Sequence, residues 1–158
     1  MRVHIAADHA GFELRESLIA HLADQDVEVV DHGAFVYDAL DAYPPMCIAA
    51  AEAVAQDQRE GTAALGIVIG GSGNGEQMAA NLVDGVRAAL IWNEATAALS
   101  REHNDANVGA IGARQHTVEE ALRLADVFLQ TPFSGDERHA DRIAMMREYE
   151  DVRCEGSR

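Results

Sequence analysis

The sequence predicts an α/β protein: a single Rossmann-like, three-layer domain with a five-stranded, mostly parallel sheet, helices on both faces and a C-terminal helical arm. Two observations support this. Short apolar segments alternate with amphipathic segments along the chain, the order typical of parallel strands joined by helices. The 158 residues suit one hydrophobic core, and no repeat, low-complexity tract or linker divides them. Residues 1–158 are therefore expected to form one domain.

Five strand-like and six helix-like segments can be recognised in order. Strands are expected at residues 2–7, 27–31, 65–69, 86–92 and 108–111. Helices are expected at residues 11–23, 46–58, 76–82, 94–102, 117–129 and 136–150. The continuous apolar run at 65–69 is typical of a strand buried on both faces. Thr117 followed by Glu120 predicts a capping box. The last helix is mostly polar, and we expect it to pack on a partner subunit.

Charge and composition exclude several functions. The formal net charge of -15 disfavours binding to nucleic acid or to anionic membranes. No apolar run reaches the roughly 18 residues of a membrane span, and no signal peptide is evident. All 12 basic residues are arginine, which excludes a lysine Schiff base and a Walker A loop. Cys47 and Cys154 form no motif and are expected to be reduced thiols of a cytoplasmic protein.

Asp8 and His9 follow the first predicted strand. Ligands of open parallel sheets bind at the carboxyl ends of the strands, where this pair would lie. A carboxylate beside an imidazole can hold a hydroxyl group and move a proton. The simpler interpretation makes Asp8 a helix N-cap and His9 a solvated neighbour.

A glycine-rich turn, residues 70–75, follows the buried strand at 65–69 and precedes Glu76. Glycines allow successive N–H groups to point into one concavity, which stabilises a phosphate or an oxyanion that forms during a reaction. Such turns are common in α/β proteins. Glu76 also has a simpler interpretation, because acidic residues are favoured in the first turn of any helix.

Further polar residues lie in the second half of the chain. His103 falls between a predicted helix and the last strand, where it could also be a surface residue. Arg114 follows that strand, and Arg138 and Arg142 share one helix face. Like charges four residues apart destabilise a helix by about 0.2–0.5 kcal/mol unless an anion binds them. Acidic residues at positions 136, 137 and 141 offer them exposed salt bridges instead.

No metal-binding pattern stands out. The sequence has no H-E-x-x-H segment, no cysteine and histidine quartet and no EF-hand loop. Neither a metal nor an organic cofactor is therefore expected.

Together these motifs resemble the ribose-5-phosphate isomerase B family, whose relatives include galactose-6-phosphate isomerase subunits. The motifs are Asp-His-Ala-Gly at 8–11, Gly-Gly-Ser-Gly-Asn-Gly-Glu at 70–76, Ala-Ala-Asn at 79–81, residues 100–107, and Arg138-His139 with Arg142. They span almost the whole chain. The resemblance implies interconversion of ribose 5-phosphate and ribulose 5-phosphate through an enediolate, by a homodimer or a tetramer with shared active sites.

The resemblance also implies roles for individual residues. Glu76 would be the proton-transfer base, because Gly70 stands where one branch of the family has a cysteine and no other cysteine is near. His103 and Asp8 would assist ring opening, and Ser72 would help to hold the enediolate. The other substrate contacts would be His9, Gly71, Gly73, Asn74, Gly75, Asn104, Arg114, Arg138, His139 and Arg142. The helix start favours a charged Glu76 and burial favours a neutral one, so the balance stays open.

Two departures from the family pattern bear on substrate preference. The chain reads Asp41-Ala42-Tyr43-Pro44 where the family usually has Asp-Tyr-Pro, and it has Leu82 where many members have lysine. Two alternatives remain open: the same reaction on a tetrose or hexose phosphate, and a flavodoxin-like module that holds a nucleotide or flavin. An inactive scaffold is disfavoured, because every reactive group that the resemblance implies is present.

Overall fold

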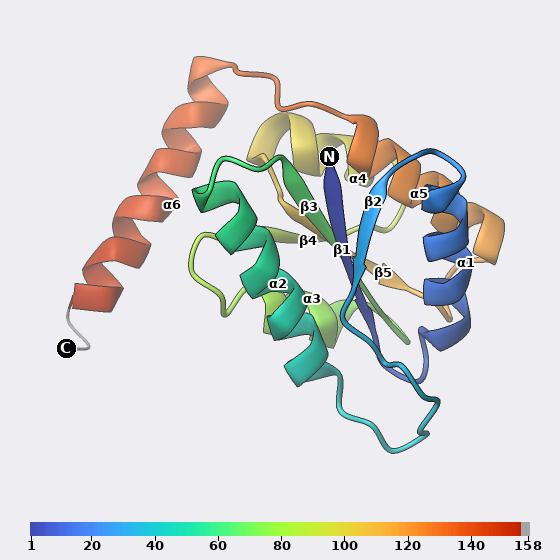
Figure 1. The fold of residues 1–158 in the computed structure, drawn as a ribbon. Coiled ribbons are helices and arrows are strands. Elements are labelled where there is room, and N and C mark those ends of the chain that lie inside the picture. Colours follow the sequence, from blue (N-terminus) through green and yellow to red (C-terminus); the bar gives the residue numbers. More distant parts are fainter. Residues whose placement is uncertain (156–158) are drawn as a thin grey trace.

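The computed structural model describes the backbone of residues 1–155 and the side chains of residues 1–152. Its centre is a five-stranded sheet with the strand order β2-β1-β3-β5-β4 (Figure 1). The strands are β1 (Arg2–Ala7), β2 (Glu28–Asp31), β3 (Ala64–Gly70), β4 (Ala88–Leu90) and β5 (Val108–Gly112). The helices are α1 (Phe12–Ala23), α2 (Tyr43–Arg59), α3 (Asn74–Ala80), α4 (Glu94–Asn104), α5 (Val118–Gln130) and α6 (Glu137–Glu155). The α/β prediction is confirmed, and every neighbouring pair of strands is parallel.

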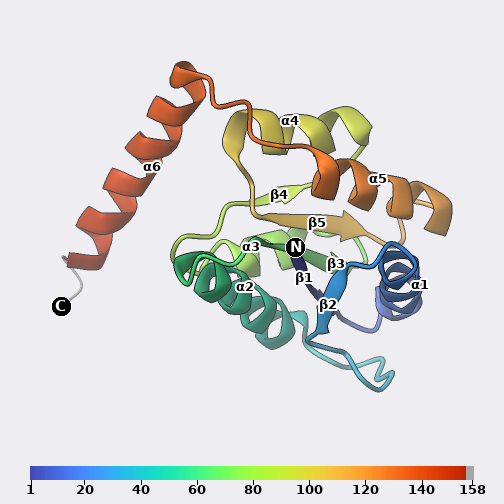
Figure 2. The same ribbon diagram turned by 45° about the horizontal axis from the view of Figure 1, so that its top comes forward.

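Helices cover both faces of the sheet (Figure 2). Val3 and Ile5 of β1 pack with α1, α4 and α5, whereas Ala6 on the opposite face packs with α2 and α3. Small side chains such as Ala50 and Ala51 allow α2 to approach the sheet closely. This alternation along each strand separates two apolar layers, and the loops after the strands open at the carboxyl edge between them.

Some boundaries differ from the sequence prediction. Helix α2 begins at Tyr43 rather than at residue 46, because its two prolines fall in the first turn, where a missing N–H leaves no helical hydrogen bond unmade. Helix α4 continues to Asn104, so His103 lies on its last turn rather than in a loop. Strand β4 has three residues instead of seven, and it pairs only with β5 at the edge of the sheet. The capping box of Thr117 and Glu120 is confirmed.

The C-terminal helix α6 stands away from the body of the domain (Figures 1 and 2). Its first half is anchored by the buried side chains of His139 and Ile143. Beyond them, apolar side chains are exposed: Met145, Met146, Tyr149 and Val152. Its packing on a partner stays a prediction. None of the helices formed by residues 1–155 is long and apolar enough to cross a membrane. Cys47 is a free thiol, and the side chain of Cys154 lies outside the described residues.

Candidate active site

Asp8 and His9 lie at the carboxyl end of β1. The Asp8 carboxylate is buried, and its Oδ1 accepts the backbone N–H groups of Ala10 at 2.9 Å and Gly11 at 3.2 Å. Gly11 is the N-cap of α1, so Asp8 braces the turn ahead of the helix rather than capping it. The other oxygen, Oδ2, lies 3.8 Å from Nδ1 of His9.

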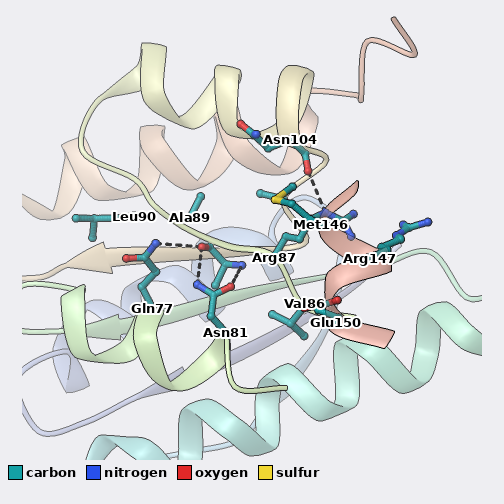
Figure 3. Close-up of a pocket in the computed structure, with 12 residues that line it drawn as sticks. Gln77, Asn81, Val86, Arg87, Ala89, Leu90, Asn104, Met146, Arg147 and Glu150 are labelled. Atoms are coloured by element: carbon teal, nitrogen blue, oxygen red, sulfur yellow. Dashed lines mark hydrogen bonds between the residues drawn. The ribbon is translucent and has the colours of Figure 1, made fainter. Parts of the chain in front are cut away.

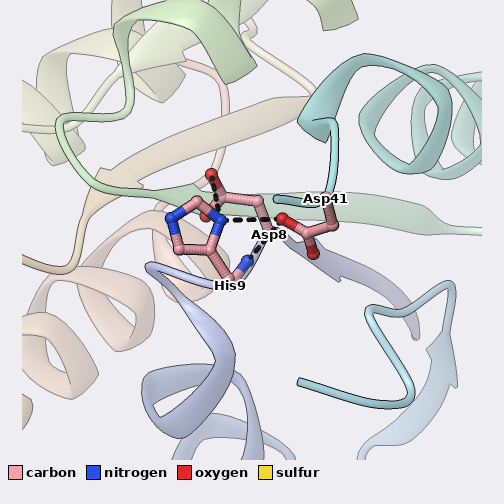
Figure 4. Close-up of side chains that lie close together, drawn as sticks. All are labelled: Asp8, His9 and Asp41. Atoms are coloured by element: carbon pink, nitrogen blue, oxygen red, sulfur yellow. Dashed lines mark hydrogen bonds and ion pairs between the residues drawn. The ribbon is translucent and has the colours of Figure 1, made fainter. Parts of the chain in front are cut away.

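Asp41 completes this cluster, although the sequence interpretation did not include it. Its Oδ1 accepts the backbone N–H of His9 at 3.0 Å and lies 2.8 Å from the ring Nδ1 (Figure 4). One ligand atom each from Asp8, His9 and Asp41 lie within 4.8 Å of one another, a set that could hold a metal ion. The displaced acid of the Asp-Ala-Tyr-Pro segment is the one sequence signal that could have identified Asp41.

Glu76 lies in the first turn of α3 and is only 4% exposed. Its carboxylate occupies the space beside Gly70, at the end of β3, where an added Cβ would overlap the carboxylate atoms. A cysteine at position 70 and this placement of Glu76 therefore exclude each other. The absence of a side chain at Gly70 is a physical requirement of the glutamate position.

The environment of Glu76 raises its pKa above the usual range. Burial is the main cause, and the charge of Asp8 adds to it, while backbone N–H groups of Glu76 and Gly73 oppose it. Burial thus outweighs the helix start, which answers the question that the sequence left open. Cys47 is close enough for Glu76 and Asp8 to contribute to its pKa of about 12, which burial raises most. The expectation that no cysteine lies near the site is therefore wrong. Cys47 is present there as a protonated thiol, which is too weakly acidic to supply a thiolate base or nucleophile.

The loop between β3 and α3 is shaped by its glycines and by Ser72. Gly73 has a φ of +80°, and an added Cβ there would lie 2.8 Å from Leu90, so glycine is required. The Ser72 hydroxyl oxygen accepts the backbone N–H of Asn74 at 3.3 Å and its side-chain amide at 3.2 Å. The Ser72 proton remains available to donate to a ligand oxygen.

Arg114 and Tyr43 border this loop. The backbone N–H of Arg114 donates to the carbonyl of Gly71 at 3.1 Å, and its guanidinium lies 3.5 Å from the point where a Cβ of Gly71 would stand. Gly75 meets the ring of Tyr43, because an added Cβ would lie 2.6 Å from it. We call the residues at this end of the sheet the carboxyl-edge group: Asp8, His9, Asp41, Gly71, Ser72, Gly73, Asn74, Gly75, Glu76 and Arg114.

The remaining predicted residues lie on α4 and α6, and we call them the amino-edge group: His103, Asn104, Arg138, His139 and Arg142. The rings of His103 and His139 pack against each other, tilted by 39° with centroids 4.1 Å apart. His139 is buried, with Nδ1 3.0 Å from the Ser134 hydroxyl and Nε2 3.3 Å from the Arg138 guanidinium. A guanidinium only donates, so Nε2 of His139 accepts and its proton lies on Nδ1. His139 is therefore held by two hydrogen bonds and packs against the ring of His103.

The two groups lie at opposite ends of the strands: the carboxyl-edge group at the carboxyl ends and the amino-edge group at the amino ends. Helix α4 leads into the start of β5, whereas Arg114 follows its end. The five residues of β5 separate the edges by about 15 Å, since each strand residue advances about 3.3 Å. Figure 2 shows β5 pointing away from α6. A single copy of the chain does not bring the predicted site residues together.

A cavity of about 520 Å³ lies between β4, α3 and α6 (Figure 3). Several of its polar groups complete the edge strand β4. Gln77 and Asn81 donate to the carbonyl of Ala88, and Asn81 also accepts the N–H of Ala88. Arg87 donates to the carbonyl of Asn104. These contacts hold the edge strand in place, and the side chains of Arg147 and Glu150 line the cavity from α6.

Comparison with known proteins identifies the class of protein. Residues 3–146 match the family model described as Ribose/Galactose Isomerase. The chain belongs to this family of sugar isomerases.

Individual relatives cover nearly the whole chain. Ribose-5-phosphate isomerase B of Mycolicibacterium paratuberculosis is 53% identical over 150 residues, covering 95% of this chain and 92% of that protein. The Escherichia coli K12 protein of the same name is 36% identical and covers 96% and 98%. The structure of ribose-5-phosphate isomerase B from Mycoplasma genitalium with bound ribulose-5-phosphate has a TM-score of 0.88 at 39% identity, covering 95% of this chain and 96% of that one.

Proposed function

We propose that this protein is an aldose-ketose isomerase that interconverts ribose 5-phosphate and ribulose 5-phosphate in the cytoplasm. The observation that carries the proposal is the buried Glu76 carboxylate, seated against Gly70 beside the loop that contains Ser72. The named activity of relatives up to 53% identical supports the choice of sugar, as does the ribulose-5-phosphate held by the Mycoplasma genitalium structure.

The chemistry requires one base. The Glu76 carboxylate takes the proton from C2 of the open-chain aldose, and the electron pair of that C–H bond forms the C1–C2 double bond of an enediolate. Returning the proton to C1, while the O2 proton moves to O1, gives the ketose. A raised pKa suits this role, because a base close to the working pH can both accept and return the proton. Ser72 and the loop N–H groups would stabilise the developing oxyanion.

The proposed active unit is a homodimer with composite sites. The amino-edge group of one copy would complete the carboxyl-edge group of the other, with His103 and Asp8 assisting ring opening and the arginines binding the phosphate. Three observations support this: the separation of the two groups across β5, the exposed apolar face of α6, and the open groove in Figure 3. An exposed apolar face and an open groove are typical of a surface that another subunit covers. A second copy of the chain would cover both the face and the groove.

A panel of four-, five- and six-carbon aldose phosphates tests the reaction. The purified protein should show the highest kcat/KM with ribose 5-phosphate, measured by formation of the ketose. A higher kcat/KM with a tetrose or hexose phosphate would show that this other sugar phosphate is the preferred substrate. No isomerisation of any sugar phosphate would refute the proposal.

A further inference from the structure

We propose that Asp41 is a positioning residue: it holds His9 so that Nε2 of the ring faces the substrate. The kinetic part of this inference rests on the proposed isomerase function, whereas its structural part does not. Asp41 lies in the loop before α2, where its side chain makes both of its hydrogen bonds to His9.

Two hydrogen bonds to a single carboxylate oxygen fix the imidazole. The backbone N–H of His9 reaches Asp41 Oδ1 at 3.0 Å and ring Nδ1 reaches it at 2.8 Å. A carboxylate only accepts, so the contact places a proton on Nδ1. Nε2 is then the nitrogen left for a ligand, and it points away from both Asp8 and Asp41 (Figure 4). The pairing thus determines both the ring orientation and the tautomer.

Asp8 does not supply this hold. Its Oδ1 is occupied by two backbone N–H groups, and its Oδ2 lies 3.8 Å from Nδ1, beyond hydrogen-bond distance. Asp41 is fixed independently of Asp8: its own N–H donates to the carbonyl of Asp38 at 3.0 Å, and α2 begins at Tyr43. A short, braced segment therefore presents the Asp41 carboxylate.

The second oxygen of Asp41 indicates function rather than fold stability. Oδ2 is buried and has no hydrogen-bond partner among the described residues. A buried polar group left unpaired lowers the stability of the fold. A carboxylate that served only the fold would be expected to pair both oxygens, whereas one that orients His9 needs only Oδ1.

Kinetics of single and double variants test the proposal. Asp41→Ala should raise the KM for ribose 5-phosphate at least ~10-fold, a loss of about 1.4 kcal/mol, with a smaller change in kcat. Asp41→Asn retains an acceptor oxygen and should recover most of this loss. Asp41→Ala added to His9→Ala should cost little more, because its partner is already gone. Asp38→Asn removes a charge from the same loop while keeping the acceptor for the Leu40 N–H, and serves as the control.

Nitrogen-15 NMR of the His9 ring, without substrate, tests the same point independently of activity. The wild-type ring should carry its proton on Nδ1, and Asp41→Ala should shift the proton toward Nε2. The positioning role would be overturned if Asp41→Ala left the tautomer unchanged. It would also be overturned if Asp41→Ala raised the KM by the same factor in the His9→Ala variant as in the wild type. If the wild-type protein isomerises no sugar phosphate, the proposed function fails, yet the tautomer measurement still decides whether Asp41 positions His9.

Discussion

The carboxyl-edge group contains three carboxylates and one arginine, whereas the amino-edge group contains two arginines and no carboxylate, and the two groups are also built in opposite ways. At the carboxyl edge, Asp8 and Glu76 are buried, and backbone N–H groups and Asp41 hold the side chains in place. At the amino edge, Arg138 and Arg142 are exposed on a helix that leaves the domain. Proton transfer needs a base that is buried and held in place, whereas a phosphate can be bound by exposed positive side chains. The difference supports the proposal that the proton-transfer base lies at the carboxyl edge and that the two arginines of the amino edge bind the phosphate.

Glu76→Gln should have the largest effect. The substitution keeps the shape of the side chain but removes the base, so kcat should fall by more than ~10²-fold while substrate binding survives. For the wild-type protein, the raised pKa of Glu76 should place the acid limb of the kcat/KM profile above the ordinary glutamate value of 4.5. Near-normal turnover of the variant would show that the base lies elsewhere.

The same variant should be more stable than the wild type at neutral pH. Because the pKa of Glu76 is raised in the folded state, the folded protein holds its carboxyl proton more tightly than the unfolded chain. Keeping the buried carboxylate ionised at pH 7 therefore opposes folding, and a neutral glutamine removes that penalty. Urea unfolding should show this advantage at pH 7 and its decline as the pH falls toward 4.5. An advantage that does not change with pH would contradict the assignment of the raised pKa.

Mixing two inactive variants tests whether the groups of two copies form one site. Glu76→Gln and His103→Ala, co-refolded in equal amounts, should give about half heterodimers, each with one intact site, and hence roughly a quarter of wild-type activity. Glu76→Gln mixed with Asp8→Asn is the control: both changes lie at the carboxyl edge, so no intact site can form. Recovery in the control, or none in the test pair, would refute shared sites.

The sequence predicted the fold well because its signals are local. Apolar periodicity, the glycine-rich turn and the capping box of Thr117 and Glu120 each act within a few residues, and the structure contains all of them. The start of α2 was misplaced because Pro44 and Pro45 suggest a loop, although the first turn of a helix tolerates proline.

The site was less predictable because it depends on contacts between distant residues. Asp41 reaches His9 across 32 positions, and no spacing rule links them. The balance that raises the pKa of Glu76 depends on how deeply α3 packs, which only the tertiary structure gives. The order of strands and motifs does place Asp8 after a strand and His103 before one, at opposite ends of a parallel sheet, a conclusion that was not drawn from the sequence.

Arg138→Ala or Arg142→Ala should have an intermediate effect. Neither side chain forms an ion pair within residues 1–152, which disfavours the salt bridges that their acidic neighbours could offer. Each variant should raise the KM for ribose 5-phosphate at least ~10-fold, about 1.4 kcal/mol, with little change in Tm. Arg59→Ala, another exposed arginine near a helix end, is the control. Equal losses with an unphosphorylated sugar would show that these arginines do not bind phosphate.

Chelation should have the smallest effect, and it distinguishes two uses of the Asp8, His9 and Asp41 cluster. A metal ion bound at Nδ1 of His9 requires the lone pair of that nitrogen, whereas the 2.8 Å contact with Asp41 requires a proton there. The two states exclude each other, so if Asp41 orients His9, the working enzyme carries no metal at this cluster. Activity should then persist after exhaustive treatment with EDTA. Added Zn²⁺ should inhibit by capturing the cluster and displacing the Nδ1 proton, and Asp41→Ala should weaken that inhibition because it removes one ligand. Loss of activity on chelation that zinc or magnesium restores would instead make the cluster a metal centre, and Asp41 a ligand rather than a positioning residue.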